Sequence, residues 1–240
     1  TIAEEYEDYP SSKDFGSIAF NNYKEDIYVG YRYFETFEKD DVLYPFGFGL
    51  SYTNFELKMG NVKKGKNSVT VECTVKNVGE FSGKEVVQVY LKKPCGKLGN
   101  PARELVGFAK TGLLAPKKSE KVKIEIPNEY FCSYDDSGKS GYAYSYVMEE
   151  GEYKLYVGTD VRSAEKVWSY HQENTVQVLD LQQTAAPEVA FDRMVNDGKL
   201  KFEKTPVKEY DLRHIIIENI PRPIPRTGDK GYKLIDVKEG

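Results

Sequence analysis

Three pairs of neighbouring carboxylates are the residues in this sequence with most potential for acid–base chemistry: Asp40-Asp41, Asp135-Asp136 and Glu149-Glu150. Acid–base catalysis needs carboxyl groups that face one substrate together. Adjacent residues of an extended chain point in opposite directions, and DDSG, which begins at Asp135, is an ordinary turn sequence. The sequence therefore predicts charged turns and loops at these pairs, and no catalytic dyad.

Metal and nucleophile chemistry is also poorly represented. The chain has three cysteines, Cys73, Cys95 and Cys132, without metal-type spacing, and His171 has only Glu173 nearby. Cys95 lies in the predicted loop PCGK with no neighbouring histidine, so it is not a candidate nucleophile. No glycine-rich loop joins a strand to a helix. The sequence predicts neither a metal site nor a cofactor.

Composition narrows the class of protein. The 240 residues carry a net charge of −4, which disfavours a nucleic-acid partner. No apolar run has the length of a membrane span, and the acidic start TIAEEYEDYP lacks a secretory-signal pattern. An odd number of cysteines fits a reducing compartment. We therefore expect a cytoplasmic protein with no nucleic-acid or membrane partner.

The elements that would position any site are mainly strands. Between about residues 54 and 180 the apolar positions alternate, and the clearest runs are 69–76, 87–92, 121–126, 153–157 and 176–178. Gly, Pro and Asn turns separate these runs. The pattern predicts an immunoglobulin-like or fibronectin type III-like antiparallel β-sandwich over residues 56–180, with residues 132–147 as a surface loop.

Residues 1–55 follow a different pattern. The segment 43–55 reads LYPFGFGLSYTNF, and 27–36 reads IYVGYRYFET. Alternating Gly and Phe are too glycine-rich for a helix and too aromatic for a solvated loop. We expect the glycines to allow close backbone approach and the rings to pack in an interface. Residues 26–33 form either a short helix or a strand, and the whole segment has too few alternating apolar positions for a core of its own.

These two segments resemble the end of the α/β-sandwich domain of glycoside hydrolase family 3, the β-glucosidase and β-xylosidase family. The resemblance continues through VKNVGEFSGKEVVQVYL, RELVGFAKTGLLAPKKSEKVKIEI and EEGEYKLYVGTD, which are similar to the fibronectin type III-like domain of that family. Ala115-Pro116-Lys117 departs from the family's usual Pro-Gly turn. The match covers about residues 27–160, in order and with consistent spacing.

The resemblance implies that residues 1–55 end an α/β-sandwich domain, 56–180 form the fibronectin-like domain, and 181–240 are a linker toward a (β/α)8 catalytic barrel. Within that range, 191–200 is either a short helical or an extended piece, and IPRPIPR at 220–226 is proline-rich. This order resembles the minority of family members whose barrel comes last. The expected interface residues are Tyr31, Tyr33, Phe34, Pro45, Phe46, Gly47, Phe48, Gly49 and Tyr52.

The resemblance also says where the family's chemistry lies. Retaining hydrolysis uses two carboxyl groups about 5 to 5.5 Å apart. The family's nucleophile is an aspartate usually followed by Trp, but the only tryptophan, Trp168, follows Val167. The Lys-His pair is absent, since His171 follows Tyr170 and His214 follows Arg213. No residue takes the acid/base role, so we expect no catalytic, substrate-binding or metal-binding residue in this chain.

Two functions remain open from the sequence. In the first, the chain is the non-catalytic structural portion of a retaining β-glycosidase, whose remaining domains are its partner and whose substrate is a β-linked sugar. In the second, it is a free-standing carbohydrate- or protein-binding immunoglobulin-like module. The second draws on 19 tyrosines, especially Tyr142, Tyr144 and Tyr146, whose alternate spacing would place three rings on one strand face. Sheet packing is the other interpretation of the same tyrosines.

Overall fold

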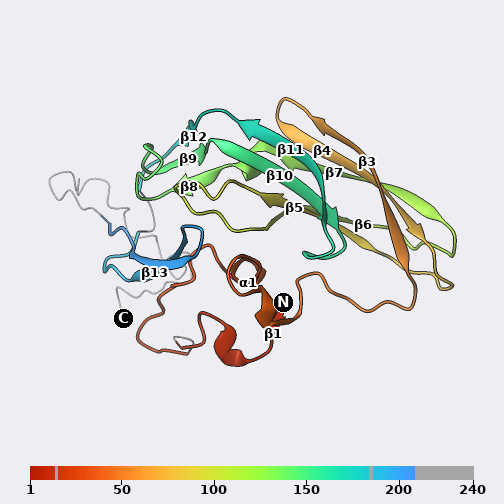
Figure 1. The fold of residues 1–240 in the computed structure, drawn as a ribbon, viewed down its shortest axis with the longest axis horizontal. Coiled ribbons are helices and arrows are strands. Elements are labelled where there is room, and N and C mark those ends of the chain that lie inside the picture. Colours follow the sequence, from red (N-terminus) through yellow and green to blue (C-terminus); the bar gives the residue numbers. More distant parts are fainter. Residues whose placement is uncertain (14–15, 184–185, 209–240) are drawn as a thin grey trace, which may run out of the picture. The chain divides into compact units, whose positions relative to one another are not determined.

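Two antiparallel sheets form the centre of the computed structural model, which describes residues 1–13, 16–183 and 186–208 (Figure 1). The first sheet has the strand order β11-β10-β5-β6, and the second has the order β3-β4-β7. The strands of these sheets are β3 (Phe55–Lys64), β4 (Ser68–Asn77), β5 (Val86–Lys92), β6 (Glu104–Lys110), β7 (Ser119–Pro127), β10 (Gly151–Gly158) and β11 (Glu165–Gln172). The predicted β-sandwich is confirmed.

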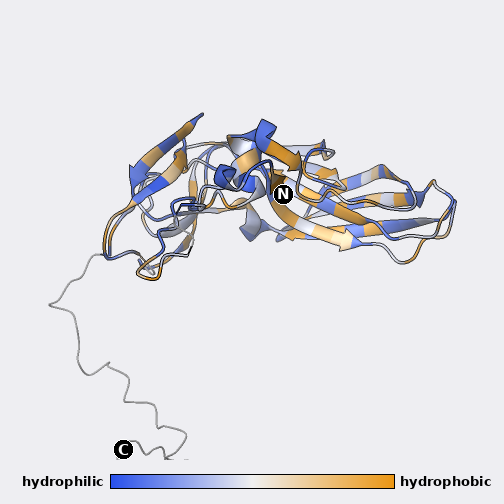
Figure 2. Ribbon diagram, turned by 90° about the horizontal axis from the view of Figure 1, so that it is seen from below, coloured by the Kyte–Doolittle hydropathy of each residue, from blue (hydrophilic) through white to orange (hydrophobic). Residues whose placement is uncertain are grey.

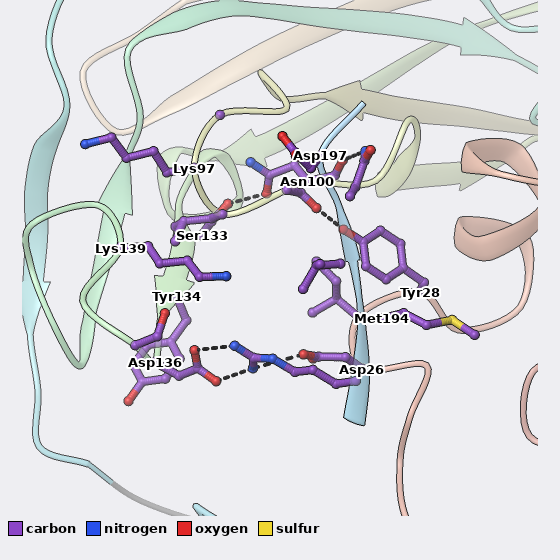
Figure 3. A pocket seen from close by; sticks show the side chains of 18 of the residues that line it. Asp26, Tyr28, Lys97, Asn100, Ser133, Tyr134, Asp136, Lys139, Met194 and Asp197 are labelled. Carbon is purple, nitrogen blue, oxygen red and sulfur yellow. Dashed lines mark hydrogen bonds and ion pairs between the residues drawn. The ribbon is translucent and has the colours of Figure 1, made fainter. Parts of the chain in front are cut away.

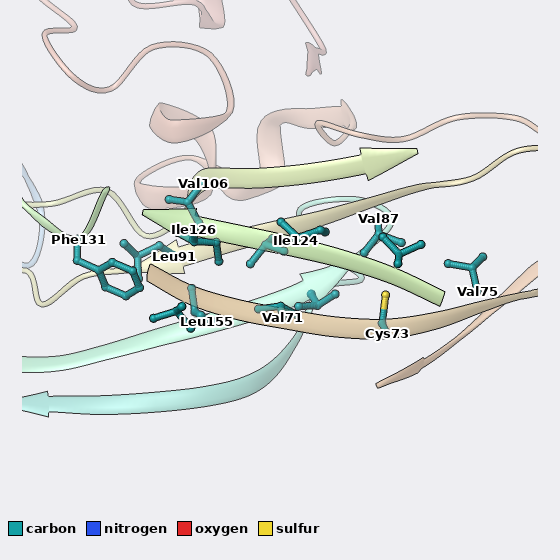
Figure 4. Close-up of a cluster of buried hydrophobic side chains, with 14 of the residues drawn as sticks. Val71, Cys73, Val75, Val87, Leu91, Val106, Ile124, Ile126, Phe131 and Leu155 are labelled. Carbon is teal, nitrogen blue, oxygen red and sulfur yellow. The ribbon is translucent and has the colours of Figure 1, made fainter. Parts of the chain in front are cut away.

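Alternation along the strands explains why the two sheets pack. Along β4, Val69, Val71, Cys73 and Val75 are buried, whereas the side chains between them are partly or fully exposed. The buried residues of both sheets meet in one apolar cluster that includes Val87, Leu91, Ile126 and Leu155 (Figure 4). Colouring by hydropathy shows the same alternation along the strands (Figure 2).

Asn77 ends β4 inside the sandwich and is fully buried. Its Oδ1 accepts hydrogen bonds from the Thr53 hydroxyl (2.7 Å) and the Gly79 N–H (3.1 Å). Its Nδ2 donates to the carbonyls of Phe81 (2.7 Å) and Leu114 (2.8 Å). Because a buried amide is costly unless its groups are bonded, this residue fixes the turn that follows the strand.

Smaller elements surround the sandwich. A second three-stranded sheet has the order β12-β9-β8, β1 and β2 form a two-stranded antiparallel sheet, and β13 and β14 form a hairpin. Their bounds are β1 (Ile2–Ala3), β2 (Val42–Tyr44), β8 (Ser133–Asp135), β9 (Ser145–Met148), β12 (Val176–Asp180), β13 (Asp192–Asn196) and β14 (Leu200–Lys204). In the described residues the α-helix is α1 (Tyr31–Thr36), and short 3-10 helices span Tyr6–Asp8, Lys39–Asp41 and Asn128–Phe131.

The N-terminal segment does have a small core, which corrects the expectation that it has none. Tyr28, Tyr33 and Phe34 are buried with Ala3 and Val42. The cluster is completed from the far end of the chain, by Met194 of β13 and the half-buried Leu200 of β14. The sequence of residues 1–55 could not show this core because two of its members lie some 150 residues away.

Two other expectations about the chain are refined. Residues 132–147, expected as a loop, contain β8 and the start of β9, and Asp135 and Ser145 are buried there. Residues 192–204, inside the range expected as a linker, form the β13–β14 hairpin, so the extended alternative for 191–200 is the correct one. The proline-rich 220–226 and His214 lie outside the described residues. Within the described residues, no helix is long and apolar enough to cross a membrane.

Candidate functional site

The N-terminal segment covers the outer face of the four-stranded sheet. Tyr31 and Phe46 stack with ring centroids 4.6 Å apart, and Tyr31 meets the ring of Tyr90 edge-on. The Leu105 N–H donates to the Tyr31 hydroxyl (2.7 Å), and the Val161 N–H donates to the Phe46 carbonyl (3.0 Å). As a result Tyr90, on the face opposite the sandwich core, is completely buried.

Gly47 lies at the closest point of this contact. Its φ is +89°, a conformation that residues with a side chain rarely adopt. An added Cβ would come within 2.8 Å of the Asp160 Cα and within 2.9 Å of the Gln88 amide oxygen. Gly49, by contrast, has open space around it and no positive φ. The expectation that at least one of the two glycines excludes a side chain is confirmed for Gly47.

The other half of the aromatic segment faces outward. Leu50 and Tyr52 are 93% and 96% exposed, and Phe48 is about half exposed, with its ring 5.0 Å from that of Tyr44. Tyr33 and Phe34 lie in the small N-terminal core, and Pro45 begins the turn in which the Phe48 N–H bonds to its carbonyl. The predicted interface residues therefore divide into a buried group and an exposed group.

Exposed apolar side chains also lie before this segment, in β1 and β2. The exposed group comprises Ile2, Leu43, Tyr44, Phe48, Leu50 and Tyr52, all from β1, β2 or the segment after β2. We call these six residues the apolar strip. Within the strip, Ile2 pairs with Tyr44, and the ring of Tyr44 lies 5.0 Å from that of Phe48. Contiguous exposed apolar surface on a folded unit marks contacts with another protein surface. The strip is therefore a candidate contact for further protein.

A charge cluster centred on Arg193 joins the N-terminal segment, the fibronectin-like domain and the β13–β14 hairpin (Figure 3). The Arg193 guanidinium pairs with Asp136 through both terminal nitrogens, the longer contact being 2.9 Å. It also contacts Asp26 (3.1 Å) and Glu203 (3.0 Å), and Glu203 pairs with Lys139. The Arg193 side chain is only 11% exposed. Sequence reasoning missed this cluster because its members come from separate segments.

Protonation in the cluster follows from burial and charge. Burial raises the pKa of Asp26 above its ordinary value, and the neighbouring carboxylates of Asp136 and Glu203 add to the rise, while Arg193 opposes it. Burial disfavours the charged form of Arg193, but hydrogen bonds and charges from Asp136 and Asp26 outweigh it and raise the pKa of Arg193. The guanidinium therefore stays charged and holds three carboxylates together.

Asp135 and Asp136 have separate structural roles. Asp135 is buried, and its carboxylate accepts hydrogen bonds from the N–H groups of Ser137, Gly138, Lys139 and Ser140. Burial works against its charge, but the hydrogen bonds of Ser140, Ser137 and Gly138 outweigh it, and the pKa of Asp135 is lowered. Asp136 is held by Arg193. Asp135 thus organises a turn, as the DDSG pattern predicts.

Glu149 anchors the loop of residues 95–100. The side chain is buried, and its carboxylate accepts a hydrogen bond from the Lys97 N–H (2.7 Å) and lies 3.4 Å from the Asn100 amide nitrogen. Burial raises the pKa of Glu149, although the backbone hydrogen bonds from Lys97 and Leu98 oppose the rise. Glu150 is exposed. This pair also serves the fold.

The three tyrosines expected on one strand face do not share one. Only Tyr146 lies in a strand, β9, whereas Tyr142 and Tyr144 lie in the preceding loop, where Tyr144 has a φ of +56°. Tyr146 instead pairs directly with Tyr134 of β8, with ring centroids 5.4 Å apart. Alternate spacing failed here because the strand begins only at Ser145.

Side chains that could hold a metal ion do not come together in the part of the chain that the structure describes. No group of three His, Cys, Asp or Glu residues in that part has the geometry of a metal site. Cys73 and Cys132 are buried free thiols, and burial raises the pKa of each. Cys95 is exposed, and its sulfur lies 3.5 Å from the Asn196 carbonyl.

Comparison with known proteins identifies the sandwich. A family model described as a fibronectin type III-like domain matches residues 85–161. A β-glucosidase of Ruminococcus albus is 45% identical over 241 residues, which cover 100% of this chain and 25% of the relative. The crystal structure of a β-glucosidase from Paenibacillus barengoltzii has a TM-score of 0.86 and 43% identity, and covers 100% of this chain and 28% of that one.

A further solved structure carries the family's designation. The GH3 β-glucosidase of Bifidobacterium adolescentis has a TM-score of 0.60 and 31% identity, over 75% of this chain and 25% of its own. The chain belongs to glycoside hydrolase family 3. It spans about a quarter of the length of the relatives named here. This chain represents the fibronectin type III-like domain of family 3 together with its flanking regions. It corresponds to a non-catalytic portion of much longer proteins.

Proposed function

We propose that this family 3 chain is the structural portion of a retaining β-glycosidase that hydrolyses terminal non-reducing β-D-glucosyl residues. The observation that carries the proposal is the division of the aromatic segment. Phe46 and Gly47 are packed against the fibronectin-like sheet, whereas Leu50 and Tyr52 project outward a few residues later. One short segment thus attaches to this domain and offers a surface to further protein.

The relatives suggest what such a surface would serve. They are β-glucosidases three to four times as long as the region they share with this chain. The remaining domains of such an enzyme are the partner we propose for the apolar strip. By holding those domains in a fixed arrangement, the chain would keep two carboxyl groups at the separation that retention requires, about 5 to 5.5 Å.

If this chain supports the domains that carry the two carboxyl groups, the chain alone should be inactive. Its carboxylates are engaged in turns, loops and the Arg193 cluster, as Asp135, Glu149 and Asp136 show. Incubation of the isolated chain with an aryl β-glucoside should release no aglycone. Turnover that vanishes in the Asp135→Asn or Asp136→Asn variant would refute the proposal, since it would place chemistry here.

The apolar strip gives the positive test. In the complete enzyme, Leu50→Asp and Tyr52→Asp should lower both the melting temperature and the rate of aryl β-glucoside hydrolysis. Val178→Asp is the matched control, because Val178 is an exposed apolar residue of β12 outside the strip. Equal effects of all three variants, or no effect of the first two, would contradict a contact at the strip.

A free-standing module is the weaker alternative. An isolated module has no need of the apolar strip. Similarity to β-glucosidases also extends over the whole chain, beyond the fibronectin-like domain. Both observations support an integral part of a larger enzyme.

A further inference from the structure

A cavity of about 1000 Å³ opens beside the Arg193 cluster (Figure 3). Its lining consists of the N-terminal residues 26–32, the loop 93–100, the β8 region 132–139 and the β13–β14 hairpin, together with Glu104 of β6 and Tyr146 of β9. A second cavity of about 540 Å³ shares Asp26, Tyr134, Asp136 and Arg193 with it. Pockets for small ligands usually have volumes of about 300–1,000 Å³, so the two together offer room for more than one ring.

An aromatic pair lines this space. Tyr134 and Tyr146 are directly opposite each other on β8 and β9, so the strand pairing fixes their rings at 5.4 Å. Tyr146 is 41% exposed. The carbon–hydrogen face of a pyranose ring is apolar and is attracted to the electron-rich face of a tyrosine, while its hydroxyls stay at the rim.

Polar groups suited to hydroxyls lie next to the rings. Asp136 and Lys139, whose side chains are 36% and 38% exposed, present a carboxylate and an ammonium on the same wall. Most charged groups of the cavity are already paired with one another, as Arg193 is with Asp136 and Lys93 is with Glu104. A charged ligand would have to compete with these pairs, whereas a neutral polyol can donate to the carboxylates and accept from the cations without separating them.

We propose that this cavity is a non-catalytic binding site for a neutral β-linked gluco-oligosaccharide, with Tyr146 as its main stacking residue and Asp136 as a hydroxyl acceptor. The choice of β-linked glucose rests on the proposed function, since an auxiliary site on such an enzyme would hold the polymer whose ends are hydrolysed. The site lies on this chain and needs no catalytic carboxylate.

Calorimetric titration of the complete chain with cellotetraose tests the proposal. We expect saturable binding, and we expect Tyr146→Ala to weaken it by about tenfold. Tyr134→Ala should have a similar effect, and Asp136→Asn a smaller one. Tyr142→Ala is the matched control, because Tyr142 is an exposed tyrosine of the same region that lines neither cavity. Unchanged melting temperature of Tyr146→Ala will show that its fold is intact.

Three results would overturn the proposal: no saturable binding of cellotetraose, the same loss in Tyr142→Ala as in Tyr146→Ala, or tighter binding of an acidic oligogalacturonate than of cellotetraose. The outcome is separable from that of the proposed function. Cellotetraose binding is measured on this chain, whereas the strip variants Leu50→Asp and Tyr52→Asp are measured by hydrolysis of an aryl β-glucoside in the complete enzyme, so either proposal can fail without the other.

Discussion

The sandwich and the N-terminal segment bury their aromatic and apolar side chains in different ways. The sandwich has one core, supplied by alternating residues of strands that pair with one another. The N-terminal segment has a small core that needs Met194 and a second contact on Tyr90, both supplied from elsewhere. A core built from one set of paired strands should unfold as a unit. The N-terminal core, which we call borrowed because Met194 and Leu200 of a distant hairpin complete it, should open locally. The two regions therefore differ in how far a defect in each will spread.

The largest effect should come from the centre of the sandwich. Leu155→Ala removes a completely buried side chain, and we expect it to lower the free energy of unfolding by about 3 kcal/mol. Denaturant titration followed by the fluorescence of Trp168, which packs against this core, measures the loss. Retained stability would show that the sandwich is not one cooperative unit.

A defect at the contact between the two regions should stay local. Gly47→Val places a Cβ against Asp160 and forces an unfavourable φ, so we expect a cost of about 1–3 kcal/mol, confined to residues 27–48. Hydrogen exchange should speed up there and remain slow in β4 and β5. Gly49→Val is the control, because that position is open. If the two variants behave alike, the close approach at Gly47 is not what holds the segment.

The Arg193 cluster joins the regions by charge, and its loss should have a moderate effect. Arg193→Met leaves Asp26, Asp136 and Glu203 without their shared partner. Because these carboxylates are about one-third exposed, we expect a loss of about 1–2 kcal/mol, less than for a deeply buried pair. Limited proteolysis of the β13–β14 hairpin measures it. Arg193→Lys should recover only part, since lysine cannot bind Asp136 through two nitrogens.

The smallest effect is a pH dependence at Glu149. Its pKa is raised in the folded chain, so the stability it contributes is fully present below its unfolded pKa, near 4.5, and is lost as pH rises through the folded value. Glu149→Gln keeps an acceptor for the Lys97 N–H but does not titrate. The melting temperature of Glu149→Gln should therefore rise relative to that of the wild type as the pH increases from 4. A difference in melting temperature that does not change with pH would contradict a raised pKa at Glu149.

Sequence patterns predicted the parts of the fold whose partners are local. The period of two in β4, β5, β7 and β10 indicated the sandwich, because one face of each strand is buried by the strands beside it. Along β5 the alternate residues Gln88 and Tyr90 are buried as well, because Phe46 and Tyr31 pack on that face of the sheet. Strands β3, β6 and β11 of the sandwich were not among the predicted runs. Strand β3 changes register between Met59 and Val62, and β11 is mostly polar.

The candidate site was predictable only in part. Gly47 could be inferred, because a glycine between two phenylalanines, outside any helix pattern, indicates a backbone that must pass close to another. The pairing of Tyr146 with Tyr134 and the convergence of Asp26, Asp136 and Glu203 on Arg193 could not, because no local pattern links residues that distant in sequence.

The borrowed core has a consequence for the order of folding during synthesis. A ribosome makes Tyr28, Tyr33 and Phe34 before the sandwich, but Met194 and Leu200, which complete their cluster, follow only after the entire sandwich has been made. The strands between residues 55 and 172 can pair as they emerge from the ribosome. The cluster of Tyr28, Tyr33 and Phe34 stays incomplete during that time. The β13–β14 hairpin therefore closes the N-terminal segment last, and a chain that stalls before residue 192 should leave those aromatic side chains accessible to a chaperone.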